Sequence, residues 1–150
     1  MKTLYPWFPK VVEANYYIAK SLVEEKKLGD ALKLLIPTTA NRNAPSALRA
    51  RSLVLIGDID VAQNNNDAAM DTYLKAAFQF GGVADAAAEG FWKGAQLLEK
   101  QAGLLNETST PKRSAQIQKA INAYKAIVTK YPNSPHLKDA QERLDALGAK

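Results

Sequence analysis

A proline-containing pattern that occurs at both ends of the chain constrains the fold more than any other feature. The pattern Y-P-x-x-P-x-x-x-x-A begins at Tyr5 and again at Tyr131, and its second half recurs at Pro45. The first proline cannot continue a helix, because it lacks an N–H and clashes with the preceding turn. The second proline suits the first position of a new helix, where that donor is not needed. Each copy therefore predicts a tight elbow between two helices, and the chain is expected to consist of repeated helices.

Apolar residues recur with the helical period between these elbows, and no segment alternates as a strand would. The first helix is expected to place Val11, Ala14, Ile18, Leu22 and Val23 on one apolar face. The predicted helices span residues 10–27, 31–36, 45–63, 67–80, 84–102, 111–131 and 135–147. The sequence therefore predicts an all-α protein.

Glycine, proline and asparagine mark the expected helix ends. Gly29 is expected to adopt a left-handed turn conformation, with Asp30 capping the next helix. Pro37 is expected to end that helix at or before Ile36, because the residue before a proline disfavours the helical conformation. The run that starts at Asn64 and the glycine at Gly148 are expected to end two later helices.

Composition excludes several classes of protein. There are no cysteines, which excludes disulfides and thiolate sites and fits either a reducing cytoplasm or a periplasm. No stretch of 18 apolar residues occurs, so no membrane insertion is expected. Acidic residues interleave with the basic ones along the chain despite the formal net charge of +5, which argues against a nucleic-acid-binding face.

The residues that could support catalysis are few. His136 is the only histidine, no partner is positioned for it by the sequence, and it is expected to be an exposed residue of the elbow. Asp67 and Asp71 share a helix face, but both fall in a first helical turn, where carboxylates favour the helix dipole. We therefore expect no enzyme activity, no cofactor and no metal.

A set of small and aromatic residues at fixed spacing resembles the signature of the tetratricopeptide repeat (TPR). The match is best at residues 50–83, where Gly57, Ala69, Tyr73 and Ala76 hold the signature positions. The corresponding residues are Ala19, Ala31 and Leu35 in the first unit and Ala95, Ala120, Tyr124 and Pro132 in the third. The third unit departs from the family by an insertion of thirteen residues, which is expected to form an extended loop around residues 103–110.

This resemblance implies a right-handed α-solenoid of about three helical hairpins and a C-terminal capping helix. The units would be residues 10–40, 45–80 and 84–132 with a cap at 134–148, forming one domain over residues 1–150 that belongs to a longer array. By similarity to the family, the protein would be a scaffold that binds a protein or peptide in its concave groove. The groove residues implied are Tyr16, Lys20, Val23, Arg51, Val54, Asp58 and Trp92. Phe91, next to Trp92, is expected to lie inside the hairpin, with Trp92 partly exposed.

Two alternatives remain open beside a groove-binding scaffold. One is a structural assembly module that stacks on other repeats, and the other is an accessory domain fused to an enzyme. Apolar residues before the first helix favour self-association or upstream repeats, because an uncovered repeat face is adhesive. The residues expected to pack in such a homodimer are Leu4, Tyr5, Trp7 and Phe8.

The elbow at Tyr131 is similar to repeats of bacterial cell-envelope proteins, such as the outer-membrane assembly lipoprotein and the periplasmic coordinator of cell division. This similarity favours a location at a bacterial cell envelope.

Overall fold

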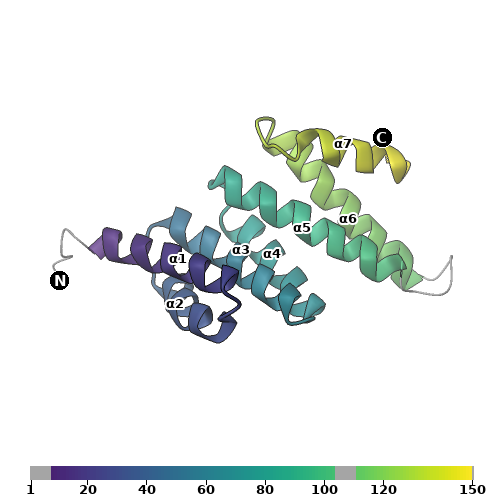
Figure 1. Ribbon diagram of the computed structural model, residues 1–150. Coiled ribbons are helices and arrows are strands. Elements are labelled where there is room, and N and C mark those ends of the chain that lie inside the picture. Colours follow the sequence, from purple (N-terminus) through teal and green to yellow (C-terminus); the bar gives the residue numbers. More distant parts are fainter. Residues whose placement is uncertain (1–7, 104–110, 150) are drawn as a thin grey trace.

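The computed structural model describes residues 8–103 and 111–149, and its described part consists of helices joined by short connections (Figure 1). Helices make up 82% of these residues and no strand occurs among them, which confirms the all-α prediction. The helices are α1 (Phe8–Glu24), α2 (Leu28–Ala40), α3 (Ser46–Ala62), α4 (Asn66–Gln79), α5 (Ala84–Gly103), α6 (Pro111–Lys130) and α7 (Leu137–Ala146).

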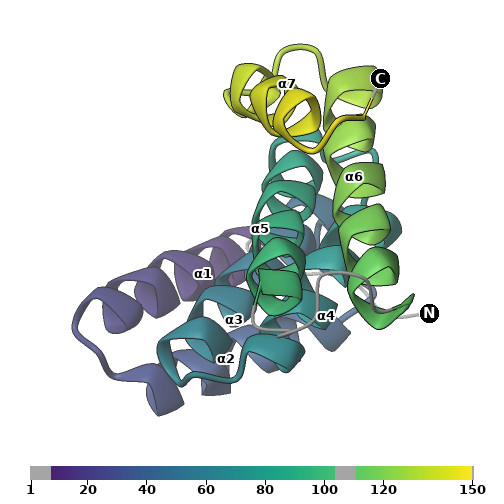
Figure 2. The ribbon, with the colours of Figure 1, turned by 90° about the vertical axis from the view of Figure 1, so that its right-hand side faces the viewer.

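The helices pack in the order in which they follow one another along the chain. Each helix contacts the next, and α1 also contacts α3, as α3 also contacts α5. The pairs α1–α2, α3–α4 and α5–α6 form hairpins, and α7 crosses one end of the last pair (Figures 1 and 2). The first helices of the three pairs therefore lie side by side. Within the described residues, no helix is both long and apolar enough to cross a membrane.

Small residues lie where the two helices of each pair approach each other. Ala19, Ala31, Ala69, Ala95 and Ala120 are all fully buried. Gly57 shows why a small residue is required, because a Cβ atom there would lie 2.5 Å from Cε1 of Tyr73. Both signature tyrosines and the leucine that replaces them in the first pair are also buried: Tyr73, Tyr124 and Leu35. The same packing arrangement thus recurs in the three hairpins.

The prediction that Pro37 ends its helix is wrong. Helix α2 continues through Pro37 to Ala40, and Asn41 N–H donates to the carbonyl of Pro37. Next to the proline, the Thr38 hydroxyl donates to the Leu34 carbonyl at 2.9 Å. A proline lowers helix stability but does not forbid a helix that tertiary packing holds. Leu35 and Thr38 provide that packing, since both are buried.

The left-handed residue after α1 is Lys26, with φ of 62°, and not Gly29. Lys27 N–H donates to the Leu22 carbonyl and Lys26 N–H to that of Val23, which is the Schellman arrangement. Gly29 lies inside α2, and Asp30 is in its first turn instead of capping it. The expected ends at Asn64 (φ 62°) and Gly148 (φ 71°) are confirmed as left-handed residues of the same kind.

Lys26→Gly is therefore expected to stabilise the protein. Glycine adopts positive φ without the steric cost that a Cβ atom imposes, so the free energy of unfolding should rise by about 1 kcal/mol. Lys27→Gly is the matched control, because Lys27 has φ of −88° and gains no such relief. Urea denaturation of both variants measures the difference. Equal destabilisation by the two substitutions would contradict the left-handed assignment.

The residues predicted to form one apolar face of the first helix do not all face the core. Val11 and Ile18 are 41% and 51% exposed, and Ala14 is exposed with them. Val12 and Ala19 are buried instead, with Leu22 and Val23 packed against the core. Helix α1 is thus apolar on more than one side, and one of these sides has no partner among the described residues.

The helices of the third hairpin are longer than those of the second, in agreement with the predicted ranges 84–102 and 111–131. Helix α5 continues to Gly103, well past Ala95, and α6 begins at Pro111, well before Ala120. The two helices have 20 residues each, compared with 17 in α3 and 14 in α4. Of the loop predicted around residues 103–110, only Gly103 is described, as the last residue of α5, and residues 104–110 lie outside the described residues.

Candidate functional site

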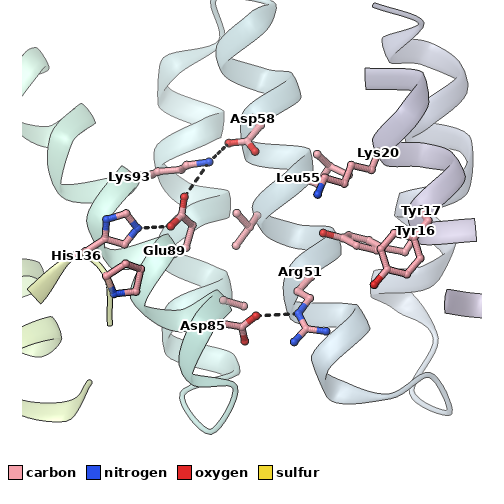
Figure 3. A pocket seen from close by; sticks show the side chains of 13 residues that line it. Tyr16, Tyr17, Lys20, Arg51, Leu55, Asp58, Asp85, Glu89, Lys93 and His136 are labelled. Carbon is pink, nitrogen blue, oxygen red and sulfur yellow. Dashed lines mark hydrogen bonds and ion pairs between the residues drawn. The ribbon is translucent and has the colours of Figure 1, made fainter. Parts of the chain in front are cut away.

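A groove of about 570 Å³ runs across the first helices of the three hairpins (Figure 3). Its floor is α3, and α1 and α5 form its two sides. The elbow before α7 closes one corner. The groove is lined by Tyr16, Tyr17 and Lys20 of α1, Arg51, Val54, Leu55 and Asp58 of α3, Asp85, Ala86, Glu89 and Lys93 of α5, and Pro135 and His136 of the elbow.

Helical spacing brings these side chains to one surface. In α3, Arg51, Val54, Leu55 and Asp58 follow the i, i+3, i+4, i+7 pattern, which places them on one face of a helix. In α5, Asp85, Glu89 and Lys93 follow each other at intervals of four and so form a single stripe of charged side chains, two acidic and one basic. The groove is therefore built by regular helices.

Ion pairs connect the floor of the groove to its α5 side. Arg51 Nε donates to Asp85 Oδ2 at 2.9 Å, and Lys93 Nζ donates to Asp58 Oδ1 at 2.7 Å. Lys93 also lies 3.2 Å from Glu89 Oε1, and Glu89 in turn contacts Nε2 of His136. The charged residues of the lining number three of each sign, so they largely compensate one another. Among the described residues Lys20 forms no ion pair, and its charge faces the groove.

A buried tyrosine fixes the position of Asp58. The Tyr73 hydroxyl donates to Asp58 Oδ1 at 2.6 Å, the same oxygen that accepts from Lys93. Burial raises the pKa of Tyr73, and the hydrogen bond to the Asp58 carboxylate raises it further. Burial alone would lower the pKa of Lys93, but Asp58 and Glu89 outweigh it and raise that pKa. Asp58 is thus part of the hairpin's structure as well as part of the groove wall.

Glu89 is expected to make the free energy of unfolding depend on pH in the acid range. Burial would raise its pKa, but the hydrogen bond from His136 and the charge of Lys93 outweigh burial and lower the pKa from 4.5. A lowered folded-state pKa stabilises the protein above the unfolded-state pKa, and that stabilisation is lost as the pH falls through the folded-state pKa. Glu89→Gln should therefore cost about 1 kcal/mol near neutral pH, and the cost should shrink below about pH 4.5. Thermal melts over a pH series measure the difference, with the exposed Glu142→Gln as control. A cost that does not change down to about pH 3 would contradict the assignment.

Five of the seven residues implied by the family resemblance line this groove. They are Tyr16, Lys20, Arg51, Val54 and Asp58. Val23 instead packs against the core between α1, α2 and α3. That the five groove residues bind a partner stays a prediction.

Trp92 does not line the groove, because the elbow covers it. Its ring is stacked on the His136 ring with centroids 5.2 Å apart, and it also contacts Tyr124. Trp92 is only partly exposed and Phe91 is 3% exposed, as the sequence predicted for this pair. His136 was expected to be an exposed elbow residue, but its side chain is only 20% exposed and is held between Trp92 and Glu89.

Sequence reasoning missed the α5 side of the groove and Tyr17. The charged stripe of Asp85, Glu89 and Lys93 was visible in the sequence as a spacing of four residues. Trp92 was predicted as the groove residue of this helix, which is one position away from the residue that lines the groove, Lys93. His136 was not predictable, because its place depends on how the elbow folds back over α5.

The residues predicted for self-association remain untested. Leu4, Tyr5 and Trp7 lie outside the described residues, and Phe8 opens α1 with its side chain also outside the description. In the described part of the chain, no group of three His, Cys, Asp or Glu side chains could hold a metal ion.

No family model matches this chain, and neither a curated protein nor a solved structure is significantly similar to it.

Proposed function

We propose that this protein is a non-catalytic, TPR-like scaffold that holds a segment of a partner protein in the groove across α1, α3 and α5. The observation that carries the proposal is that the first helices of three successive hairpins present one continuous lined surface. Stacked hairpins present such a surface in repeat proteins that bind peptides. The recurring small residue at each helix crossing supports a solenoid arrangement of the hairpins.

The chemistry of the lining favours an extended peptide. Tyr16 and Tyr17 supply aromatic surface at one side, and their rings contact each other edge to face at 5.3 Å. Aromatic residues provide large contact areas at a low cost in side-chain entropy. The paired charges of α3 and α5 offer hydrogen-bond partners to a peptide backbone, and Lys20 offers a positive charge for an acidic residue or a C-terminal carboxylate.

Selection from a random peptide library displayed on phage tests this proposal. The groove variant carries Tyr17→Ser and Lys20→Glu, both of which change exposed side chains and should leave the melting temperature nearly unchanged. Asp58 is left intact, since its loss would also break its bond to Tyr73. The control is Lys33→Glu, an exposed residue of α2. Peptides enriched on the wild type should bind the control and fail to bind the groove variant, whereas equal binding to all three proteins would refute the proposal.

A structural assembly role is the second candidate, and the exposed side of α1 favours it. Val11 and Ile18 are seven residues apart, so they lie on the same side of the helix two turns apart, both substantially exposed. An apolar stripe of this kind is typically covered by another repeat or subunit. Sedimentation velocity over a concentration series tests it. A dimer that Val11→Asp with Ile18→Asp abolishes would favour assembly, and a monomer at all concentrations would exclude self-assembly through this face. Location at a bacterial envelope stays part of this proposal and rests only on the elbow resemblance.

A further inference from the structure

A second groove, of about 640 Å³, lies between α4 and α6 on the other side of α5. Its α5 residue is Phe91, which is two residues from both Glu89 and Lys93 and therefore about 200° around the helix axis from each. Glu89 and Lys93 line the groove described above. The two grooves thus open on opposite faces of the same helix, and we call the second one the α4–α6 groove.

The floor of the α4–α6 groove is apolar and includes an aromatic side chain that is largely open to solvent. Phe78 of α4 is 73% exposed, the highest value among the large apolar side chains of the described residues. Its ring meets the buried Phe91 ring edge to face, with centroids 5.2 Å apart. Leu74, Ala123 and Ala126 complete the apolar surface. A phenylalanine this exposed next to an apolar hollow typically marks an interaction site.

The rim of the α4–α6 groove is positively charged. Lys119, Lys125 and Lys130, all exposed, line it from α6. Nowhere in the described part of the chain does an acidic side chain form an ion pair with any of these three lysines. Unlike the charges of the first groove, which are paired except for Lys20, these three are all available to a partner.

Helix α6 accounts for the basic character of the whole protein. It contains five basic residues and no acidic one, and five is also the formal net charge of the chain. The rest of the sequence is therefore formally neutral. The sequence-based expectation that acidic residues interleave with basic ones throughout does not hold for this helix.

We propose that the α4–α6 groove binds an amphipathic helix of a partner protein that carries apolar anchors on one face and acidic residues beside them. Apolar anchors would fill the hollow between Leu74, Phe78 and Phe91, in the manner of helix-in-groove recognition. Acidic residues flanking the anchors would meet the lysines, whose long flexible side chains can follow a helix along the rim. An oligonucleotide would instead place phosphates over Leu74, Phe78 and Phe91, whose side chains offer them no hydrogen bonds.

Fluorescence anisotropy with a synthetic helical peptide tests this proposal directly. The probe has leucines one helical turn apart on one face and glutamates on the flanks, and a second probe replaces each glutamate with lysine. The glutamate peptide should bind the wild-type protein, more weakly at higher salt, and the lysine peptide should not. Lys119→Glu, Lys125→Glu and Lys130→Glu combined should raise the dissociation constant roughly tenfold or more. Phe78→Ser should also weaken binding.

Matched variants separate this groove from general charge effects and from the first groove. Lys10→Glu, Lys100→Glu and Lys138→Glu combined change the net charge equally at exposed positions elsewhere and should leave the affinity within about twofold. The variant with Tyr17→Ser and Lys20→Glu should also bind the glutamate peptide normally, so failure of the proposed peptide groove would not imply failure here. Circular dichroism melts confirm that each variant is folded.

Four results would overturn the proposal. The first is absence of binding by the glutamate peptide, and the second is equal binding of both peptides. The third is a dimer in sedimentation that Phe78→Ser abolishes, which would assign the groove to a second copy of this chain. The fourth is binding of anionic lipid vesicles or of a single-stranded oligonucleotide, dependent on the same three lysines and tighter than that of the glutamate peptide.

Discussion

Gly90→Ala is expected to lower the free energy of unfolding by about 3 kcal/mol, one of the two largest effects that a single substitution should have in this protein. A Cβ atom at position 90 would lie closer than 3.0 Å to the carbonyl oxygen of Tyr73 and 3.3 Å from the backbone nitrogen of Ala77. Both are backbone atoms of α4 and cannot rotate away as a side chain can. Helices α4 and α5 would therefore have to move apart, which would loosen the contact between the second and third hairpins.

Gly29→Ala is the matched control for this substitution. Gly29 also lies in a helix, but a Cβ atom there would have no atom within 4 Å. Alanine favours the helical conformation over glycine, so the free energy of unfolding should stay unchanged or rise by up to about 1 kcal/mol. Chemical denaturation measures both variants. Similar changes in the two would contradict the close approach of α4 and α5.

Glu99→Ala is expected to lower the free energy of unfolding by about 2–3 kcal/mol. The buried Tyr124 hydroxyl donates to Glu99 Oε2 at 2.5 Å, and Arg143 of α7 binds the same carboxylate. Burial raises the pKa of Tyr124 and the bond to Glu99 raises it further, so the hydroxyl stays protonated and needs an acceptor. Removing the carboxylate would leave this hydroxyl without a partner inside the third hairpin and would remove the ion pair between Arg143 of α7 and α5.

A double-mutant cycle isolates the contribution of the unsatisfied hydroxyl. Tyr124→Phe in the Glu99→Ala background removes the hydroxyl together with its acceptor, so the double variant should recover part of the lost stability. Glu142→Ala, an exposed residue of α7 whose carboxylate lies 4.0 Å from Lys138, should change stability by less than about 0.5 kcal/mol. Strictly additive effects of Glu99→Ala and Tyr124→Phe would show that the two side chains do not interact.

Helix positions were predictable where the sequence contains local signals, and the errors occur where tertiary packing overrides them. Asn64 and Gly148 ended helices as expected, because both residue types tolerate positive φ. Lys26 adopts the same conformation with no signal of its own, and Pro37 lies inside a helix that buried neighbours hold together. The small residues at the helix crossings were visible as a fixed spacing, and they are buried as that spacing implied.

The lining of the candidate groove was predictable for α1 and α3, but not for the elbow before α7, which folds back over α5. Tyr16, Arg51 and Asp58 were implied by the resemblance to the TPR family, and all three line the groove. Two features depend on contacts between distant segments: His136 covers Trp92, and Tyr73 holds Asp58 from the neighbouring helix. The α4–α6 groove was not predicted, because its apolar floor and its lysines come from helices whose packing against each other the sequence does not show.

Chemical-shift mapping with a peptide selected on the wild-type protein tests the central claim most directly. The peptide is titrated into uniformly labelled protein, and the amide resonances that move are assigned. The proposed scaffold function predicts the largest shifts at Tyr16, Lys20, Arg51 and Asp58, together with the groove-facing stripe of α5. Shifts confined to the exposed side of α1 or to residues outside the groove, with these four resonances unmoved, would contradict it.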